Sequence, residues 1–283
     1  MEVPGVTLRK MKREEAAIAV DWAAAEGWNP GLRDAACFWP VDPEGFFCAE
    51  IDGKIVGTAA VVNYDDNFSF GGFYIVDPAH RAGGIGMQLA RYAMSHAGKR
   101  VLGVDGVVAM VPKYEGSGDL FLHYNNARYE GSGGGKMPDG LTSLMDVKFA
   151  DLLAYDTAHF PAQREAFLRC WIRQESHFGL ARLDREGKIS GYGVRRACRN
   201  GHKIGPLFAR DRATAELILD GLVAGIPGEP FFLDIPVPNK AAVVLVEDRK
   251  MTPFFFTARL YTTKEPVPLP LGEIFGVTSF ELG

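Results

Sequence analysis

The sequence predicts a mixed α/β protein made of two copies of one fold. Three observations support this prediction. The first half contains a strand, a glycine-rich loop, a helix and a second strand in that order, the second half repeats similar elements, and a glycine-rich stretch separates the two halves. The length of 283 residues is that of about two domains. A content of 47% hydrophobic and 23% charged residues is usual for globular proteins and excludes a wholly disordered chain.

A helix and a hairpin open the first half. Residues 7–26 have apolar residues at helical spacing, and the turn at 27–31 ends them. Strands are predicted at 46–51, 55–63 and 70–76. Asp52-Gly53 is a typical hairpin turn between the first two strands. Gly71 and Gly72 interrupt the third strand, which indicates a bulge or the close approach of another backbone.

A β-α-β unit with a glycine-rich loop follows. The loop at 79–84 leads into an amphipathic helix, and a buried strand is predicted at 101–105. The glycines within 83–86 therefore lie at a helix N-terminus, where backbone N–H groups are unpaired and carry a partial positive charge. Glycine lets a phosphate oxygen come close to these groups, and Arg81 can add a charged contact. We predict a phosphate site here; the alternative is a tight turn that only requires glycine.

The second half repeats the first without its glycine-rich loop. A hairpin, a glycine-interrupted strand, a helix and a further strand are predicted at 178–198, 203–208, 213–223 and 231–234. Residues 257–259 resemble residues 126–128, and a last strand is expected at 275–282. The loop at 210–213 contains no glycine, so we expect one phosphate site per chain. The predicted domains are 1–131 and 141–283, joined by a glycine-rich linker at 132–140.

Composition and spacing argue against several classes of protein. A net charge of −4 lacks the basic footprint of a nucleic-acid-binding protein. No stretch approaches the ~18 apolar residues of a membrane span, and residues 1–15 do not resemble a signal peptide, so we expect a cytoplasmic protein. The histidines form no H-x-x-x-H pair, so we expect no metal. The cysteines form no C-x-x-C motif and are expected to be reduced thiols; they are Cys37, Cys48, Cys170 and Cys198.

The segment from Phe73 to Gly86 resembles motif A of the GCN5-related N-acetyltransferases (GNAT), which reads V-x-P-x-x-R/Q-x-x-G-x-G/A. The resemblance covers residues 7–130. The segments at 26–31 and 275–283 are similar to a bacterial two-domain type of this family. The resemblance implies tandem GNAT-like (acyl-CoA N-acyltransferase) domains, each with a central mixed sheet flanked by helices. It also implies that the first domain holds the coenzyme A site and that the second is degenerate.

The resemblance further implies acetyl-CoA as the co-substrate and names the residues that would bind it. Those expected at its pantetheine arm are Tyr74, Ile75 and Val76. Those expected at its pyrophosphate are Arg81, Ala82, Gly83, Gly84, Ile85 and Gly86. Trp28 and Asn29 belong to the region that lines the acceptor pocket in this fold, with a place in the core as the alternative for Trp28.

Acyl transfer to an amine needs a polarised thioester and a proton for the leaving thiolate. A backbone N–H of Val76 or Ile75 is the predicted oxyanion donor. In the family a Tyr in a Y-x-x-x-G-F context often acts as general acid. Tyr114 has this context, except that Asp119 replaces the Phe, and packing is its alternative role.

The ammonium group of the acceptor must also lose a proton. Many relatives place a Glu on the bulged strand, but the predicted strand at 70–76 has no acidic residue. Asp105 at the end of the next strand is therefore the predicted general base, directly or through water, with a turn acid as the alternative role. His123 is a further candidate.

Three functions remain open at this point. The first is direct transfer of an acetyl group, in a ternary complex, from acetyl-CoA to the primary amine of a small acceptor. The second is an acyl-CoA sensor without turnover, which the missing acid motivates. The third is a nicotinamide oxidoreductase, for which Leu89 stands where the fingerprint needs its third glycine. The expected partner is a small amine rather than nucleic acid or membrane, and a homodimer is left open.

Overall fold

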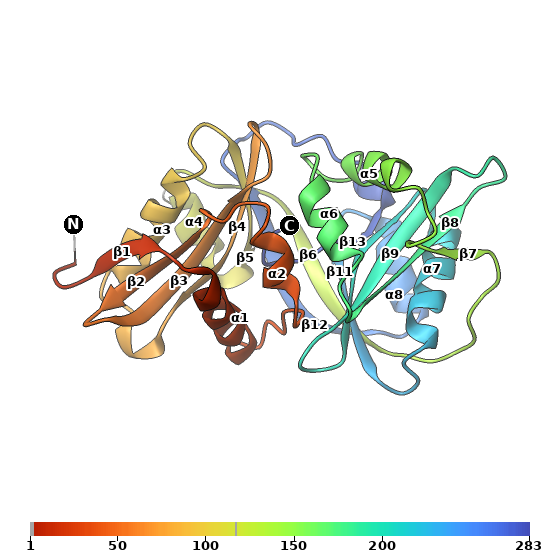
Figure 1. Cartoon of the computed structure of the whole chain (residues 1–283), viewed down its shortest axis with the longest axis horizontal. Helices are drawn as coiled ribbons and strands as arrows, with labels where there is room; N and C mark the ends of the chain where they lie inside the picture. The colour runs from red at the N-terminus through yellow and green to blue at the C-terminus, as the bar shows by residue number, and fades with distance from the viewer. Residues whose placement is uncertain (1–2, 117) are drawn as a thin grey trace.

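The computed structural model describes residues 3–116 and 118–283, and within them the strands form one mixed, 13-stranded sheet with helices on both faces (Figure 1). The strands are β1 (Thr7–Lys10), β2 (Phe46–Ile51), β3 (Lys54–Asn63), β4 (Phe68–Val76), β5 (Val101–Val107), β6 (Phe121–Ser132), β7 (Leu141–Ser143), β8 (His177–Leu183), β9 (Ile189–Ala197), β10 (His202–Ala209), β11 (Pro230–Pro236), β12 (Thr252–Tyr261) and β13 (Ile274–Gly276). The helices are α1 (Ala16–Ala25), α2 (Asp34–Phe38), α3 (Ile85–Ser95), α4 (Val111–Gly116), α5 (Phe149–Thr157), α6 (Glu165–Trp171), α7 (Arg212–Ala224) and α8 (Lys240–Asp248).

The two halves exchange a strand. The strand order is β1-β2-β3-β4-β5-β12-β6-β11-β10-β9-β8-β7, with β13 beside β10. Strand β12 of the second half pairs with β5, and β6 of the first half pairs with β11. The mixed α/β fold class is confirmed. The central sheets of the two halves are joined into one, because each half completes the sheet of the other.

The internal repeat is confirmed element by element. The β2–β3 and β8–β9 hairpins are antiparallel, and the strand that follows each hairpin pairs in parallel with the next one. The helices α3 and α7 make the two crossovers, as a β-α-β unit requires. The start of the first helix differs from the prediction: residues 7–10 form β1 against β2, so the helix expected over 7–26 begins only at Ala16.

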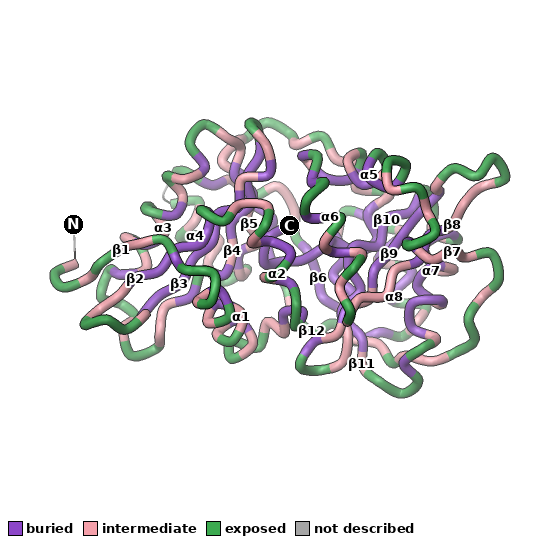
Figure 2. The backbone as a smooth tube through the Cα atoms, viewed as in Figure 1, coloured by how far each residue is buried: buried purple, intermediate pink, exposed green. Residues whose placement is uncertain are grey.

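The helices of the two halves share a core on one face of the sheet. Buried apolar residues of α1, α2, α5 and α6 form a single cluster with β4 and with the C-terminal segment 277–282. On the opposite face, α3 and α4 pack on the first half, and α7 and α8 pack on the second. Figure 2 shows the resulting burial, which is concentrated on the central strands, while the outer loops are exposed.

Two connecting segments are tied to the body of the protein. The glycine-rich segment 133–140 joins β6 to β7, and the Gly133 and Gly134 amides donate to Glu229 and Val223 carbonyls at 2.8 and 2.9 Å. The boundaries at 131 and 141 stay a prediction. The C-terminus lies between the halves (Figure 1), where the buried Leu282 carbonyl accepts a 2.7 Å hydrogen bond from the Tyr64 hydroxyl.

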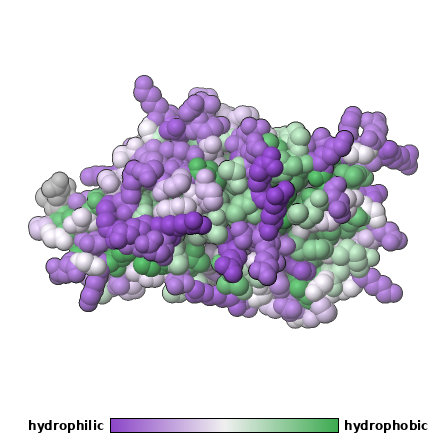
Figure 3. All heavy atoms as spheres, in the orientation of Figure 1, coloured by the Kyte–Doolittle hydropathy of each residue, from purple (hydrophilic) through white to green (hydrophobic). Residues whose placement is uncertain are grey.

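The outer surface is mainly hydrophilic on the face seen in Figure 3, with apolar side chains in smaller patches between the charged ones. None of the helices in the described part of the chain is long and apolar enough to cross a membrane. Across residues 3–116 and 118–283, no group of three or more His, Cys, Asp or Glu side chains is arranged to hold a metal ion.

Candidate active site

Strand β4 carries the bulge that its glycines predicted. Two of its residues, Phe73 and Tyr74, stand opposite a single residue of β3, Ala59. Phe73 has a φ of 48°, which is rare for a residue with a side chain. The buried Thr58 hydroxyl donates to the Phe73 carbonyl at 2.9 Å and so holds the bulge in place. The bulge shifts the alternation of side chains, so Phe73 lies in the shared core and Tyr74 faces the other way.

Gly72 allows another backbone to come close to β4, which was the second interpretation of the glycines in this strand. A Cβ at this position would overlap the Glu281 carbonyl group of the C-terminal segment. The segment can therefore lie directly on the bulge only because residue 72 has no side chain.

A wedge opens between β4 and β5 at the bulge. Their parallel pairing runs from Phe68 and Val101 to Gly71 and Val104 and ends there. The following residues of β5 pair with β12 on their other side. The strands therefore separate toward their carboxyl ends, and the edge of β4 that faces the wedge has backbone groups free for another partner.

The backbone of Val76 faces this wedge. The amide of the next residue, Asp77, donates to the Val56 carbonyl on β3 at 2.9 Å. Because successive residues of an antiparallel ladder point to opposite sides, the Val76 amide points away from β3, whereas the Ile75 amide points toward it. Of the two predicted oxyanion donors, the geometry favours Val76.

The glycine loop is exposed and ends at the N-terminus of α3. Gly84 is the N-cap residue, with a φ of 85°, and it has no side chain to cap the helix. Ala82 also has a positive φ, 67°, so the loop is held in an unusual backbone conformation. At Gly83 an added Cβ would meet nothing closer than the His80 carbonyl at 3.8 Å. The loop thus presents open space beside the unpaired N–H groups of the first helical turn, as an anion site requires.

Gly86 and Arg81 make contacts within the protein. A Cβ at Gly86 would overlap the Tyr74 hydroxyl, so this glycine lets Tyr74 pack against the first turn of α3. The Arg81 Nε donates to the Val76 carbonyl at 2.9 Å, and the Arg81 guanidinium forms an ion pair with Glu26 at the end of α1. The predicted contact of Arg81 with a phosphate therefore competes with this ion pair.

Tyr114 lies at the wedge beside Tyr74. Its ring packs on β5, where a Cβ at Gly106 would come within 2.5 Å of a ring carbon. Burial, and then the nearby Tyr74, raise the pKa of the Tyr114 hydroxyl above its usual value. The hydroxyl is therefore protonated at neutral pH, as a general acid must be. The structure brings together Tyr74, Tyr114 and the N-terminus of α3.

Asp105 is held in a buried ion pair. Its carboxylate accepts hydrogen bonds from Arg259 Nε and a terminal nitrogen at 2.8 and 2.6 Å, and from the Asn126 amide at 2.8 Å. Burial raises the pKa of Asp105, and the positive charge of Arg259 opposes this effect. A raised pKa suits a base, but three donors occupy the carboxylate. The role of Asp105 as general base stays a prediction.

The second half contains the counterpart of this pair. Asp234 on β11 accepts hydrogen bonds from Arg128 Nε and a terminal nitrogen at 2.6 and 2.7 Å. Burial raises the pKa of Asp234, but Arg128, Lys203 and Arg196 outweigh burial and leave it below its usual value. The second half has no glycine-rich loop before α7 and still keeps this ion pair. The repeated pair therefore indicates a structural role that Asp105 and Asp234 share.

The remaining predicted residues lie at the junction of the halves. The Asn29 amide donates to the Asn200 carbonyl at 2.8 Å, and its oxygen accepts from the Asn200 amide at 3.2 Å. Trp28 packs against the shared core and its carbonyl accepts from Arg128 at 2.6 Å. His123 Nε2 donates to the Thr263 carbonyl at 2.8 Å. The structure does not bring these three side chains together, and their roles in binding or catalysis stay predictions.

The chain itself fills the corresponding wedge of the second half. Strand β10 has the same kind of bulge, with Gly205 and Pro206 opposite Val194. Its parallel pairing with β11 ends at Ile204, and β13 then pairs with β10 at Leu207 and Phe208. A strand was expected here at 275–282; the structure contains it, but β13 begins at Ile274 and already ends at Gly276.

The N-terminus of α7 is also occupied. The Asp211 carboxylate accepts a 2.8 Å hydrogen bond from the Thr214 amide and caps the helix. A carboxylate at this position would repel a phosphate group. The second half therefore has neither an open wedge nor an open anion site.

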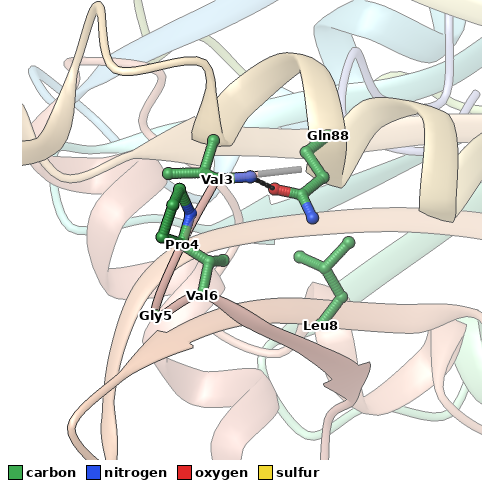
Figure 4. Close-up of a pocket in the computed structure, with 6 residues that line it drawn as sticks. All are labelled: Val3, Pro4, Gly5, Val6, Leu8 and Gln88. Atoms are coloured by element: carbon green, nitrogen blue, oxygen red, sulfur yellow. Dashed lines mark hydrogen bonds between the residues drawn. The ribbon is translucent and has the colours of Figure 1, made fainter. Parts of the chain in front are cut away.

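A surface cavity borders the glycine loop of the first half. It has a volume of about 550 Å³ and is lined by Val3, Pro4, Gly5, Val6, Leu8 and Gln88 (Figure 4). The Val3 amide donates to the Gln88 side chain at 3.1 Å, and a Val3 methyl group lies 3.4 Å from the place of a Cβ on Gly84. A ligand held by the loop can extend into this space.

Comparison with known proteins gives two family matches. Residues 12–116 match the family described as "Acetyltransferase (GNAT) family", and residues 152–276 match "Acetyltransferase (GNAT) domain". The chain is 30% identical over 283 residues to the holothin acyltransferase of Pseudoalteromonas sp. (strain SANK 73390), across 98% of this chain and 94% of that protein.

Solved structures share the fold over the whole chain. A putative acetyltransferase from Pyrococcus horikoshii superimposes with a TM-score of 0.83 at 20% identity, covering 100% of this chain and 98% of the other. A tandem GNAT protein from the clavulanic acid biosynthesis pathway superimposes with a TM-score of 0.65 at 12% identity, covering 92% and 100% of the two chains.

Proposed function

Since this chain belongs to the GNAT acetyltransferase family, we propose that it transfers an acetyl group from acetyl-CoA to the primary amine of a small acceptor. The observation that carries the proposal is the wedge between β4 and β5, which opens directly beside the exposed N-terminus of α3. An extended ligand with a phosphate at one end and amides along its length matches this combination.

The coenzyme would use backbone groups of the first half. Its pyrophosphate would lie against the N–H groups of the loop at Gly83–Gly86, and its pantetheine amides would pair with the exposed edge of β4 at Tyr74 and at the Val76 carbonyl. The cavity beside Val3 leaves room for the nucleotide end. We expect one coenzyme per chain, because β13 and Asp211 occupy the equivalent places in the second half.

The thioester supplied by acetyl-CoA places a carbonyl and a sulfur in the wedge. The Val76 amide would stabilise the oxyanion, a contribution that is worth about 3 kcal/mol for one donor in enzymes where it has been measured. The protonated Tyr114 would give its proton to the leaving sulfur. Asp105 is the proposed base. Arg259 and Asn126 occupy three of the about four lone-pair sites of its carboxylate, so it would take the proton through a water bound at the remaining site on Oδ2.

The acceptor is proposed to attack the thioester directly, in a ternary complex. A relative of nearly the same length is named a holothin acyltransferase, which supports acyl transfer and makes holothin the first acceptor to test. Radiolabelled acetyl-CoA tests the direct route: label trapped covalently on the protein would contradict it.

A second function is favoured by one observation. The residues of β4 include no acid, and the Asp105 carboxylate is tied to Arg259. Without a base the same wedge would bind an acyl-CoA and not turn it over, as a sensor does.

A thiol-release assay separates the two functions. Acetyl-CoA and longer acyl-CoAs are mixed with holothin and a panel of small amines, and free coenzyme A is measured. Release that depends on an amine supports the transferase. Calorimetric binding of acetyl-CoA without release would support the sensor, and binding of NADH alone would contradict both.

A further inference from the structure

Two cysteines that are far apart in the sequence meet between the halves. Cys37 lies on α2 of the first half and Cys170 on α6 of the second. The two helices pack against each other, with the Phe38 and Phe167 rings stacked at 5.2 Å. Cys37 is buried and Cys170 is half-buried, so one of the two thiols can be reached from solvent.

The sulfurs share one polar neighbour. The Gln174 amide nitrogen donates to Cys170 Sγ at 3.0 Å and to Cys37 Sγ at 3.3 Å. Cys170 Sγ also lies 3.6 Å from the Ala36 carbonyl, next to the Cys37 peptide. The hydrogen bond from the Cys37 thiol, and then the one from Gln174, lower the pKa of Cys170 to about 7 despite partial burial.

The other cysteines lack this arrangement. Cys48 and Cys198 are buried, and burial raises the pKa of each to about 11. Since the thiolate is the reactive form, these two residues are internal controls for reactivity within one molecule.

We propose that Cys37 and Cys170 form a redox-active pair that a peroxide oxidises to a disulfide linking the two halves of the chain. The Cys170 thiolate attacks a peroxide oxygen, the O–O bond breaks, and the leaving hydroxide takes up a proton as water, which leaves a sulfenic acid on Cys170. The Cys37 sulfur then attacks the Cys170 sulfur, the S–O bond breaks, and the second hydroxide leaves as water with the Cys37 proton. The two thiols lose two electrons and the peroxide gains them.

The reaction has a structural consequence. A bond between residues 37 and 170 closes a long loop of chain and therefore restricts the unfolded state. It also fixes α2 against α6, next to the turn where Leu32 pairs with Ala197 of the second half. The oxidised protein should unfold at a higher temperature than the reduced protein.

The test uses the full-length reduced protein and hydrogen peroxide in slight excess. The protein is denatured, alkylated with N-ethylmaleimide and mapped by mass spectrometry without reduction. The expected result is the loss of two hydrogen atoms and one peptide pair joined at Cys37 and Cys170. Cys48 and Cys198 should remain fully alkylated, dithiothreitol should reverse the link, and the unfolding midpoint should fall back with it.

Variants separate the pair from general oxidation. In Cys37→Ser, peroxide should leave a sulfenic acid on Cys170 that dimedone captures, and no link should form. In Cys198→Ser, the link should form as in the parent protein. Four alkylatable cysteines in the peroxide-treated parent would overturn the proposal, as would a link made equally by Cys48 or Cys198.

Discussion

Arg259 of the second half stands directly opposite Asp105 of the first half in the β5–β12 ladder, and its guanidinium donates two hydrogen bonds to the Asp105 carboxylate. Arg128 and Asp234 repeat the relationship in the β6–β11 ladder. Each pair joins a strand of one half to a strand of the other. The exchange of strands and the two buried ion pairs are therefore parts of one arrangement.

We expect Arg259→Met to reduce the free energy of unfolding by about 3–5 kcal/mol, because it leaves the buried Asp105 charge without its partner. Arg128→Met should cost a similar amount through Asp234. Guanidinium denaturation of both variants measures the loss. A loss below about 1 kcal/mol in either variant would mean that water or another cation replaces the arginine.

The internal repeat supplies a matched control for the proposed base. Asp105→Asn and Asp234→Asn remove the same charge from the same kind of pair, so their effects on stability should be similar. If Asp105 acts as the base, only Asp105→Asn should lower kcat, by about 100-fold or more. Steady-state kinetics at a temperature where both variants are folded decide the matter. Equal kcat values would assign Asp105 to the ion pair alone.

The sequence predicted the bulge on β4 and missed the exchange of strands between the halves, and both outcomes have a physical reason. A bulge is a local feature, and the glycines at 71 and 72 revealed it. The strand that pairs with β5 is β12, and its Arg259 is 154 residues away from Asp105 in the sequence. Residues 126–128 and 257–259 have nearly the same pattern, so either segment fits beside Asp105 by its sequence. For the same reason Asp105 was identified as a base while its arginine remained unrecognised.

Gly83→Asp should weaken binding of acetyl-CoA by about tenfold or more, because it places a negative charge at the phosphate site. Gly83 is a better position than Gly84, whose φ of 85° would strain any side chain. Gly272→Asp adds the same charge in open space elsewhere and should bind like the parent protein. Calorimetry should find one site in the parent and in the control. Unchanged affinity in Gly83→Asp would exclude this loop as the phosphate site.

Tyr114→Phe should lower kcat by about 100-fold while the Kd for acetyl-CoA changes little, because the hydroxyl is needed only when the thiolate leaves. Tyr74→Phe removes a hydroxyl from the same wedge and should have a smaller effect on kcat. Burial raises the pKa of Tyr114 above the ordinary value of a tyrosine. The hydroxyl of the parent protein should therefore keep its proton in mildly alkaline solution, and kcat should not fall there through its loss. A kcat equal to that of the parent would leave Tyr114 with a packing role.

The stability of the protein should decrease in mild acid through His177. Burial, followed by the charge of Arg196, lowers the pKa of His177 to about 4, while its Nδ1 donates to the Trp171 carbonyl at 2.7 Å. The unfolded chain, with a pKa near 6.5, binds a proton that the folded chain does not. The contribution of the neutral His177 to the free energy of unfolding is therefore complete above pH 6.5 and is lost as the pH falls toward 4.

At pH 5.5 this loss amounts to about 1 kcal/mol. Denaturant unfolding of the parent and of His177→Gln at pH 7.5 and 5.5 isolates it from the carboxylates, which titrate in both proteins. The glutamine can still donate to the Trp171 carbonyl, so the variant should be less stable at pH 7.5 only to the extent that packing suffers. The difference between the two proteins should shrink by about 1 kcal/mol at pH 5.5, whereas a constant difference would show that His177 is not the group that titrates.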